Sequence, residues 1–159
     1  MNATWGIHPL RPSLDFLAED LIVLERPGVG DLRKIGDDRD ALNALLQARY
    51  PRKTEDTIRR WAGTLLRFAF AAQPGDLIVH PDAARRTLSF GRLVGDYFWR
   101  DGHPADQHCR KVQWRRTGIA RERFTAEAQK AVEGRAAFFG IGEAGPEFEA
   151  YVAASRGRR

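Results

Sequence analysis

A change of hydrophobic period at Pro74-Gly75 constrains the fold of this chain more than any other feature. Between residues 58 and 72 the apolar side chains recur at helical spacing and share one face, while the opposite face is rich in arginine. From Asp76 onward apolar and polar residues alternate with period two, which is typical of strands. Pro and Gly together end a helix. The sequence therefore predicts an amphipathic helix followed by a β-sheet.

Other segments extend this pattern. Strands are predicted at 4–8, 21–24, 77–81, 87–99, 110–116 and 136–141. Helices are predicted at 38–50, 54–73, 125–134 and 146–151, with a turn or short helix from Ser13 and loops at 26–31, 82–86 and 101–108. Thr54 and Thr125 have the side chains of N-caps. This order of elements favours an α+β domain with a curved sheet or barrel flanked by helices.

The length of 159 residues predicts one domain, over 1–153, followed by a basic tail, 154–159. The formal net charge is +5, and 22 of the 26 basic residues are arginines. Arginine suits phosphate contact, although codon bias in a GC-rich genome would also produce this excess. Cys109 is the single cysteine, so no internal disulfide is expected. The sequence contains no signal peptide and no membrane-length apolar run, which predicts a cytoplasmic protein.

Four segments occur in a recognisable order: Trp5-Gly6-Ile7, Trp61-Ala62-Gly63, the stretch 75–80 and the stretch 90–97. Together they resemble the EVE and YTH-like domains of the PUA-like superfamily. Residues 30–36 also resemble the N-terminal part of domains fused to modification-dependent restriction enzymes in bacteria. The resemblance covers Trp5 to Ala153.

This resemblance implies a PUA-like barrel whose pocket accepts one flipped, modified base between aromatic walls. The ligand would be methylated cytosine in DNA or methylated adenine in RNA. The chain looks most like the free-standing actinobacterial type that binds DNA carrying 5-methylcytosine. It implies a reader that is not an enzyme and that acts in association with the nucleoid.

Five residues are candidates for the base pocket. The resemblance favours Trp5 and Trp61 as walls, while strand alternation around residues 97–99 favours an outward Tyr97 as a third wall. Asp96 and Asp31 are candidate acceptors for the exocyclic amine of cytosine. Trp61 also fits a core position on the apolar helix face, and Asp96 also fits a turn after Gly95.

Seven basic residues are candidates for phosphate contacts, although solvated surface charge fits any one of them. They are Arg33, Lys34, Arg59, Arg60, Arg115, Arg116 and Arg121. His103, His108 and Cys109 share one predicted loop but include no Cys-x-x-Cys pair, so no metal is predicted. No cofactor is predicted either, because no Walker, GxSxG or HExxH motif occurs.

The sequence thus predicts a non-catalytic reader that binds methylated double-stranded DNA. One alternative keeps the pocket and changes the ligand to RNA or another modified base. A second is a hydrolase of the related ASCH type that acts on a modified nucleoside through a pocket lysine, Lys34 or Lys111. A third is a protein-interaction module with a structural barrel.

Overall fold

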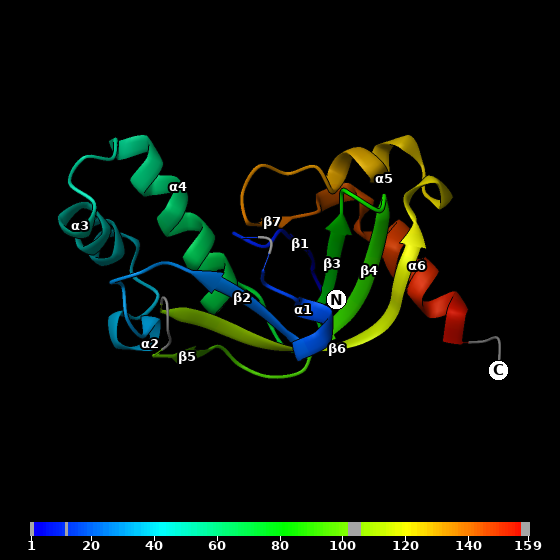
Figure 1. Ribbon diagram of the computed structural model, residues 1–159, viewed down its shortest axis with the longest axis horizontal. Helices are drawn as coiled ribbons and strands as arrows, with labels where there is room; N and C mark the ends of the chain where they lie inside the picture. The colour runs from blue at the N-terminus through cyan, green and yellow to red at the C-terminus, as the bar shows by residue number, and fades with distance from the viewer. Residues whose placement is uncertain (1, 12, 102–105, 157–159) are drawn as a thin grey trace.

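One mixed β-sheet, curled into a half-barrel, organises the chain in the computed structural model, which describes residues 2–11, 13–101 and 106–156 (Figure 1). The strands are β1 (Thr4–Ile7), β2 (Leu21–Glu25), β3 (Leu77–Asp82), β4 (Thr87–Leu93), β5 (Phe98–Arg100), β6 (Gln107–Ala120) and β7 (Phe138–Gly140). Their order across the sheet is β2-β6-β4-β3-β1-β7, and β5 also pairs with β6. β1 and β3 are parallel, whereas the other pairs are antiparallel.

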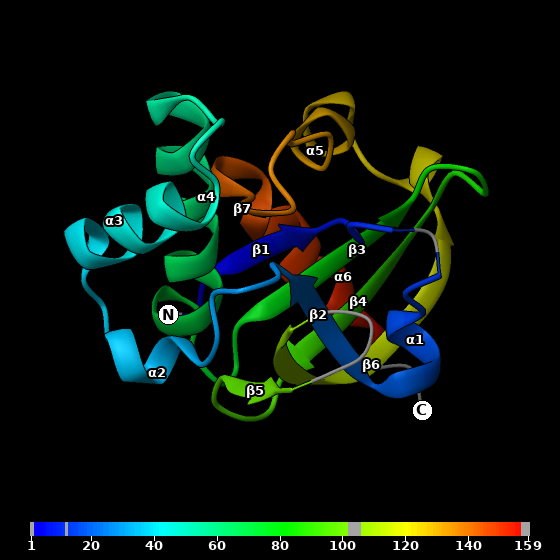
Figure 2. The same cartoon turned by 60° about the vertical axis from the view of Figure 1, so that its left-hand side comes forward.

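Helices cover both faces of this sheet. They are α1 (Phe16–Glu19), α2 (Leu32–Ile35), α3 (Arg39–Arg49), α4 (Glu55–Leu66), α5 (Ala126–Ala131) and α6 (Gly145–Arg156). A π-helical turn, Arg67–Ala71, extends α4, and 3₁₀ turns occur at Arg121–Arg123 and Gly142–Ala144. α3 and α4 form a lobe at one end of the molecule, away from α5 and α6 (Figures 1 and 2).

Two hydrophobic cores lie on opposite faces of the sheet. The larger core gathers residues of α1 to α4, β2 and β6, and the smaller one gathers residues of α5 and α6 with β3 and β4. Neighbouring residues of one strand divide between them, because side chains alternate along a strand. Ile78 and Phe138 belong to the larger core, whereas Val79 and Phe139 belong to the smaller.

The predicted helix starts are confirmed where a capping side chain marks them. Thr54 accepts a hydrogen bond from Thr57 N at the start of α4, and Thr125 accepts one from Ala128 N at the start of α5. Gly75, with a φ of 94°, adopts the left-handed conformation of the turn before β3. The α+β class with a curved sheet is likewise confirmed.

Two strand predictions are wrong in detail. The predicted strand 87–99 is interrupted, since β4 ends at Leu93, the chain bends at Gly95, and β5 begins at Phe98. The predicted loop 101–108 ends early, because β6 starts at Gln107 and buries His108 completely. Both differences arise because β5 pairs with the first residues of β6. No local pattern in the sequence indicates this pairing.

Arg110 lies inside the fold with only 1% of its surface exposed. Its guanidinium donates to Phe68 O and Ala72 O, at 2.9 and 2.8 Å, and to Gly95 O through Nε and Nη2, at 3.2 and 3.0 Å. The carbonyls at a helix C-terminus carry partial negative charge, so they suit a cation. Arg110 therefore ties β6 to the end of the α4 segment and to the bend before β5.

None of the helices in the described part of the chain is both long and apolar enough to cross a lipid bilayer.

Candidate functional site

Trp5 forms one wall of an open cavity between β1, the end of β7 and the start of α6. One face of its indole stacks on Phe138, with ring centroids 5.0 Å apart and an interplanar angle of 19°. Its Nε1 donates to Asp76 Oδ2 at 2.9 Å. Stacking fixes the plane of the indole and the hydrogen bond fixes its rotation, so the half-buried ring is held in one orientation.

Asp76 is the buried anchor of this arrangement. Besides the Trp5 indole, its carboxylate accepts hydrogen bonds from Ala3 N at 3.0 Å and Gln73 N at 2.8 Å. These bonds join the beginning of β1 to the turn before β3. The sequence predicts Gly75-Asp76 only as a turn, because the partners of Asp76 include Trp5, 71 positions away, and no local pattern links the two residues.

The cavity beside Trp5 has a volume of about 780 Å³. Its lining includes Thr4, Trp5, Gly140, Gly142, Glu143 and Glu149. A Cβ on Gly140 would lie 3.9 Å from the Trp5 ring, so glycine at this position keeps part of the indole uncovered. An uncovered aromatic face above an open cavity is the arrangement that a planar ring system needs for stacking.

Two carboxylates border the same cavity, one held by an arginine and the other without a partner among the described residues. Glu149 is held by Arg92 through two hydrogen bonds of 2.6 Å, and this pairing raises the pKa of the Arg92 guanidinium. Glu143 is exposed and makes no hydrogen bond or ion pair with any described residue. Its oxygens are therefore available to accept from an amine on a bound ring. Neither glutamate is among the acceptors predicted from the sequence.

Trp61 lies elsewhere and its ring is already occupied. The Arg26 guanidinium carbon sits 3.8 Å from the centroid of the ring, Lys53 Nζ lies 5.7 Å from it, and Tyr50 packs edge-on at 5.1 Å. Burial lowers the pKa of Arg26. The hollow beside Trp61 holds only about 10 Å³. Trp61 thus belongs to a packed cluster between α4 and the end of β2, and the structure does not bring it to the Trp5 cavity.

Tyr97 requires a correction, because it is buried and does not face outward. Its hydroxyl accepts from Leu32 N at 3.1 Å and lies 2.7 Å from His108 Nδ1, and its ring stacks on His108. Burial raises the pKa of Tyr97 well above its ordinary value and lowers the pKa of His108 to about 4. Tyr97 is therefore part of the core that fixes α2 against β6.

The two predicted acceptors are also remote from Trp5. Asp96 is exposed in the bend between β4 and β5, which matches the turn alternative. Asp31 caps α2, accepts from Arg33 N at 3.0 Å and pairs with the Arg33 side chain at 2.8 Å. That pairing lowers the pKa of Asp31. Of the five residues predicted for one pocket, the structure places only Trp5 at this cavity.

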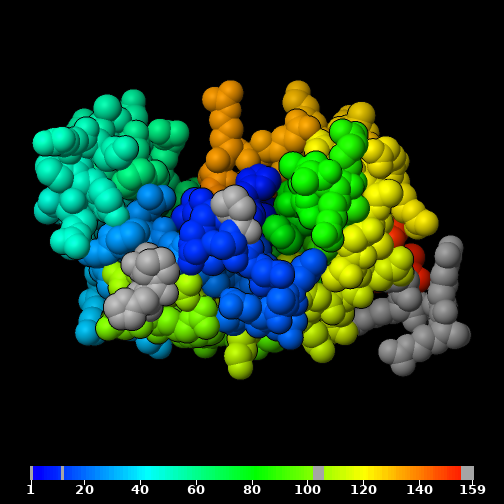
Figure 3. Space-filling model, in the orientation of Figure 1, coloured from blue at the N-terminus to red at the C-terminus, as the bar shows by residue number. Residues whose placement is uncertain are grey.

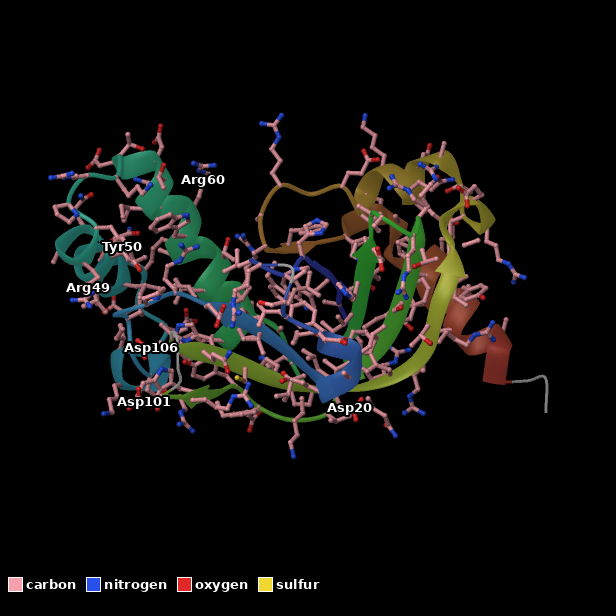
Figure 4. The ribbon with its side chains drawn as sticks, viewed as in Figure 1. Asp20, Arg49, Tyr50, Arg60, Asp101 and Asp106 are labelled. Carbon is pink, nitrogen blue, oxygen red and sulfur yellow. The ribbon has the colours of Figure 1, made fainter. Side chains whose placement is uncertain are left out.

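The seven predicted phosphate contacts fall into two groups. Arg33, Arg59 and Arg121 form ion pairs with Asp31, Glu55 and Glu133 respectively, and Arg116 lies 5.2 Å from the centroid of the Tyr151 ring. Lys34, Arg60 and Arg115 are exposed and form no ion pair with a carboxylate in the described ranges. Arg60 extends from the side of α4 that faces away from Tyr50 and α3 (Figure 4). The three unpaired residues lie on α2, α4 and β6, so they do not form one patch.

Within the described residues, no group of three His, Cys, Asp or Glu side chains is placed to hold a metal ion. His103 lies outside the described residues. Cys109 is fully buried, and burial raises the pKa of its thiol to about 11, so it remains a protonated core residue. Lys111 is exposed on β6 and lines a separate open hollow with Glu19 and Arg100.

Comparison with known proteins gives one match. The family model described as Domain of unknown function (DUF8426) matches residues 13–136. No curated protein and no solved structure matches the chain.

Proposed function

The chain belongs to the DUF8426 family, and we propose that it is a non-catalytic reader of modified DNA that stacks one flipped 5-methylcytosine on Trp5. The observation that carries the proposal is the Trp5 indole, which is fixed by Phe138 and Asp76 and opens onto a cavity of about 780 Å³. The curled sheet with helices on both faces is compatible with the PUA-like architecture that the sequence resembles.

Energetics favour a prearranged wall for this task. Extruding a base from the duplex costs a few kcal/mol, and stacking on an aromatic side chain returns about 1 to 3 kcal/mol. A ring that is already fixed loses little further conformational entropy when the base arrives. The rigid mounting of Trp5 therefore supports stacking with a base.

Edge recognition is assigned to the carboxylates of the cavity. The exocyclic amine of cytosine needs an acceptor, and its 5-methyl group needs an apolar contact. Glu143 is the free acceptor at the cavity, and the uncovered indole and Pro146 supply apolar surface. Lys34, Arg60 and Arg115 remain candidates for phosphate contact. A reader of this kind acts in the cytoplasm, in association with the nucleoid.

The test is equilibrium binding of purified protein to matched duplexes with and without 5-methylcytosine at several defined salt concentrations. Tighter binding of the methylated duplex, lost in Trp5→Ala, is the expected result. Equal affinity for the two duplexes would overturn the reading. The same series with single-stranded RNA carrying methylated adenine tests the RNA alternative.

The hydrolase alternative makes a separate prediction. If the domain acts on a modified nucleoside, turnover is measurable and is lost in Lys34→Ala or Lys111→Ala. Both lysines are exposed and neither lines the Trp5 cavity, so this geometry does not favour the alternative.

A further inference from the structure

Two arginines flank one point on the surface of α4. A Cβ on the buried Gly63 would lie 3.2 Å from Arg67 Nη1 and 3.4 Å from Arg39 Nη2. Arg39 is the first residue of α3, and Arg67 is the first residue of the π-helical turn after α4. Two guanidinium groups from different helices therefore meet where a glycine leaves space.

No carboxylate in the described part of the chain compensates these two charges. Arg67 donates only to neutral acceptors, Thr64 Oγ1 at 3.2 Å and Phe138 O at 3.3 Å. Its Nε is buried and has no hydrogen-bond partner. Burial and the neighbouring charge of Arg39 both lower the pKa of Arg67. Two like charges placed together, with a donor that no described residue uses, have the chemistry of an anion-binding site.

Other arginines differ from this pair because their charge has a partner. A buried Nε without a hydrogen-bond partner also occurs in Arg100 and Arg121, but these two form ion pairs with Glu19 and Glu133. Arg92 has Glu149, Arg11 has Glu25, and the buried Arg110 has backbone carbonyls for both its Nε and its terminal nitrogens. The π-helical turn adds a second indication, because such turns are rare and occur frequently at functional sites.

The position of the pair suits a nucleic-acid backbone. Arg67 contacts the carbonyl of Phe138, whose ring is the stacking partner of Trp5. The space-filling view shows a notch between the α3–α4 lobe and the segment before β7 (Figure 3), and Arg60 lies at this side of α4 (Figure 4). Thr64 links Arg60 to Arg67, since Thr64 Oγ1 donates to Arg60 O and accepts from Arg67 Nη2.

We propose that Arg39 and Arg67 together bind one phosphate group of the nucleic-acid backbone, with Gly63 leaving room for the two guanidinium groups to approach each other over α4. This proposal rests on the proposed function, because it supplies a phosphate site beside the wall on which the base stacks. The planar guanidinium groups suit the oxygens of a phosphate, whereas a free carboxylate at this place would have cancelled their charge.

Variants test the site through nucleic-acid binding. Arg39→Gln and Arg67→Gln are each expected to weaken binding of methylated and unmethylated duplexes equally, by about tenfold, and to reduce the slope of log K against log salt by about 0.9. Gly63→Ala keeps both charges and favours the helix, but its methyl group displaces the two guanidinium groups, so it is expected to weaken binding as well. Arg85→Gln, which removes one exposed charge on the β3–β4 hairpin, is the matched control.

A direct readout separates this proposal from the proposed function. The Nε–H resonance of Arg67 is followed by NMR during titration with inorganic phosphate and with an unmethylated duplex, and Arg110 Nε–H serves as the internal control because Gly95 O already accepts from it. A saturating shift of Arg67 with the duplex supports the site even if methylation makes no difference to affinity. If the Arg67 resonance does not shift with the duplex, the proposal is overturned, whether or not the resonance shifts with inorganic phosphate.

Discussion

Trp5 and Trp61 are both half-buried tryptophans at the margin of the larger core, yet they occupy opposite states. The Trp5 indole is held by a phenylalanine and a carboxylate on its inner side and opens onto a cavity. The Trp61 indole is covered by the Arg26 cation and flanked by Tyr50. Our choice of Trp5 as the proposed base wall therefore depends on what occupies the faces of each ring, and not on how exposed each residue is.

The largest expected effect on stability comes from removing Asp76, the side chain that holds the Trp5 indole in place. Asp76→Ala deletes the acceptor of three donors, Ala3 N, Trp5 Nε1 and Gln73 N, and leaves them unpaired. The expected loss is about 3 to 5 kcal/mol in the free energy of unfolding, because hydrogen bonds to a buried charged group are the strong ones. Urea denaturation measures it. Asp76→Asn keeps one of the two acceptor oxygens, which can still accept from Trp5 Nε1 and Gln73 N, so it should lose less; an equal loss would contradict this role.

The pH dependence of stability tests the part of the fold around His108, whose pKa is affected by Arg26, the residue that covers Trp61. Burial, opposed by Asp106 and reinforced by the charge of Arg26, lowers the pKa of His108 to about 4, below its unfolded value. Between those two values the unfolded chain binds more protons, so stability is fully present above about pH 6.5 and falls as the pH drops towards 4.

The expected loss from His108 across this window is about 3 kcal/mol. His8 and His80 also have lowered pKa values and act in the same direction. Denaturation curves at a series of pH values measure the loss. His108→Gln should flatten the pH dependence, and an unchanged dependence would show that His108 is not its source.

The preference for a methylated duplex, measured in variants of each tryptophan, tests whether Trp5 or Trp61 stacks on the base. Trp5→Ala is expected to remove about 1 to 3 kcal/mol of base stacking and with it the preference for the methylated duplex. Trp5→Phe retains an aromatic face and should keep part of that preference. Trp61→Ala should leave the preference intact in protein that circular dichroism shows to be folded. Loss of preference in Trp61→Ala alone would reverse the assignment.

Removing the cation that covers Trp61 gives the smallest expected effect. Arg26→Ala deletes a cation–π contact and should cost about 0.5 to 1 kcal/mol of stability. Thermal denaturation measures this change. If Arg26→Ala instead improved binding of the methylated duplex, Trp61 would be a base wall that Arg26 covers.

The local parts of this fold were predictable from sequence. Thr54 and Thr125 mark the starts of α4 and α5 in the sequence, because an N-cap side chain accepts a hydrogen bond from a backbone N–H only three residues further along the chain. The bond from Trp5 to Asp76 joins residues 71 positions apart, and nothing near either residue encodes it. Arg110 reads as a surface residue, since an arginine is rarely buried, and only the convergence of three carbonyls explains its position. The candidate site depends on such distant contacts, which is why Trp5 could be predicted as a pocket residue but the other residues that line its cavity could not.

The position of β1 between β3 and β7 has a consequence for how the domain folds. β1 pairs with residues 77–79 on one side and with residues 138–140 on the other, so both of its ladders close long loops. Such pairings form slowly, because chain entropy is lost before the contacts form. Trp5 acquires Phe138 only when the ladder with β7 is in place, and it acquires Asp76 when the ladder with β3 is in place. Binding through Trp5 would then report that the last strand has joined the sheet, and the rate at which binding appears during refolding would measure that step.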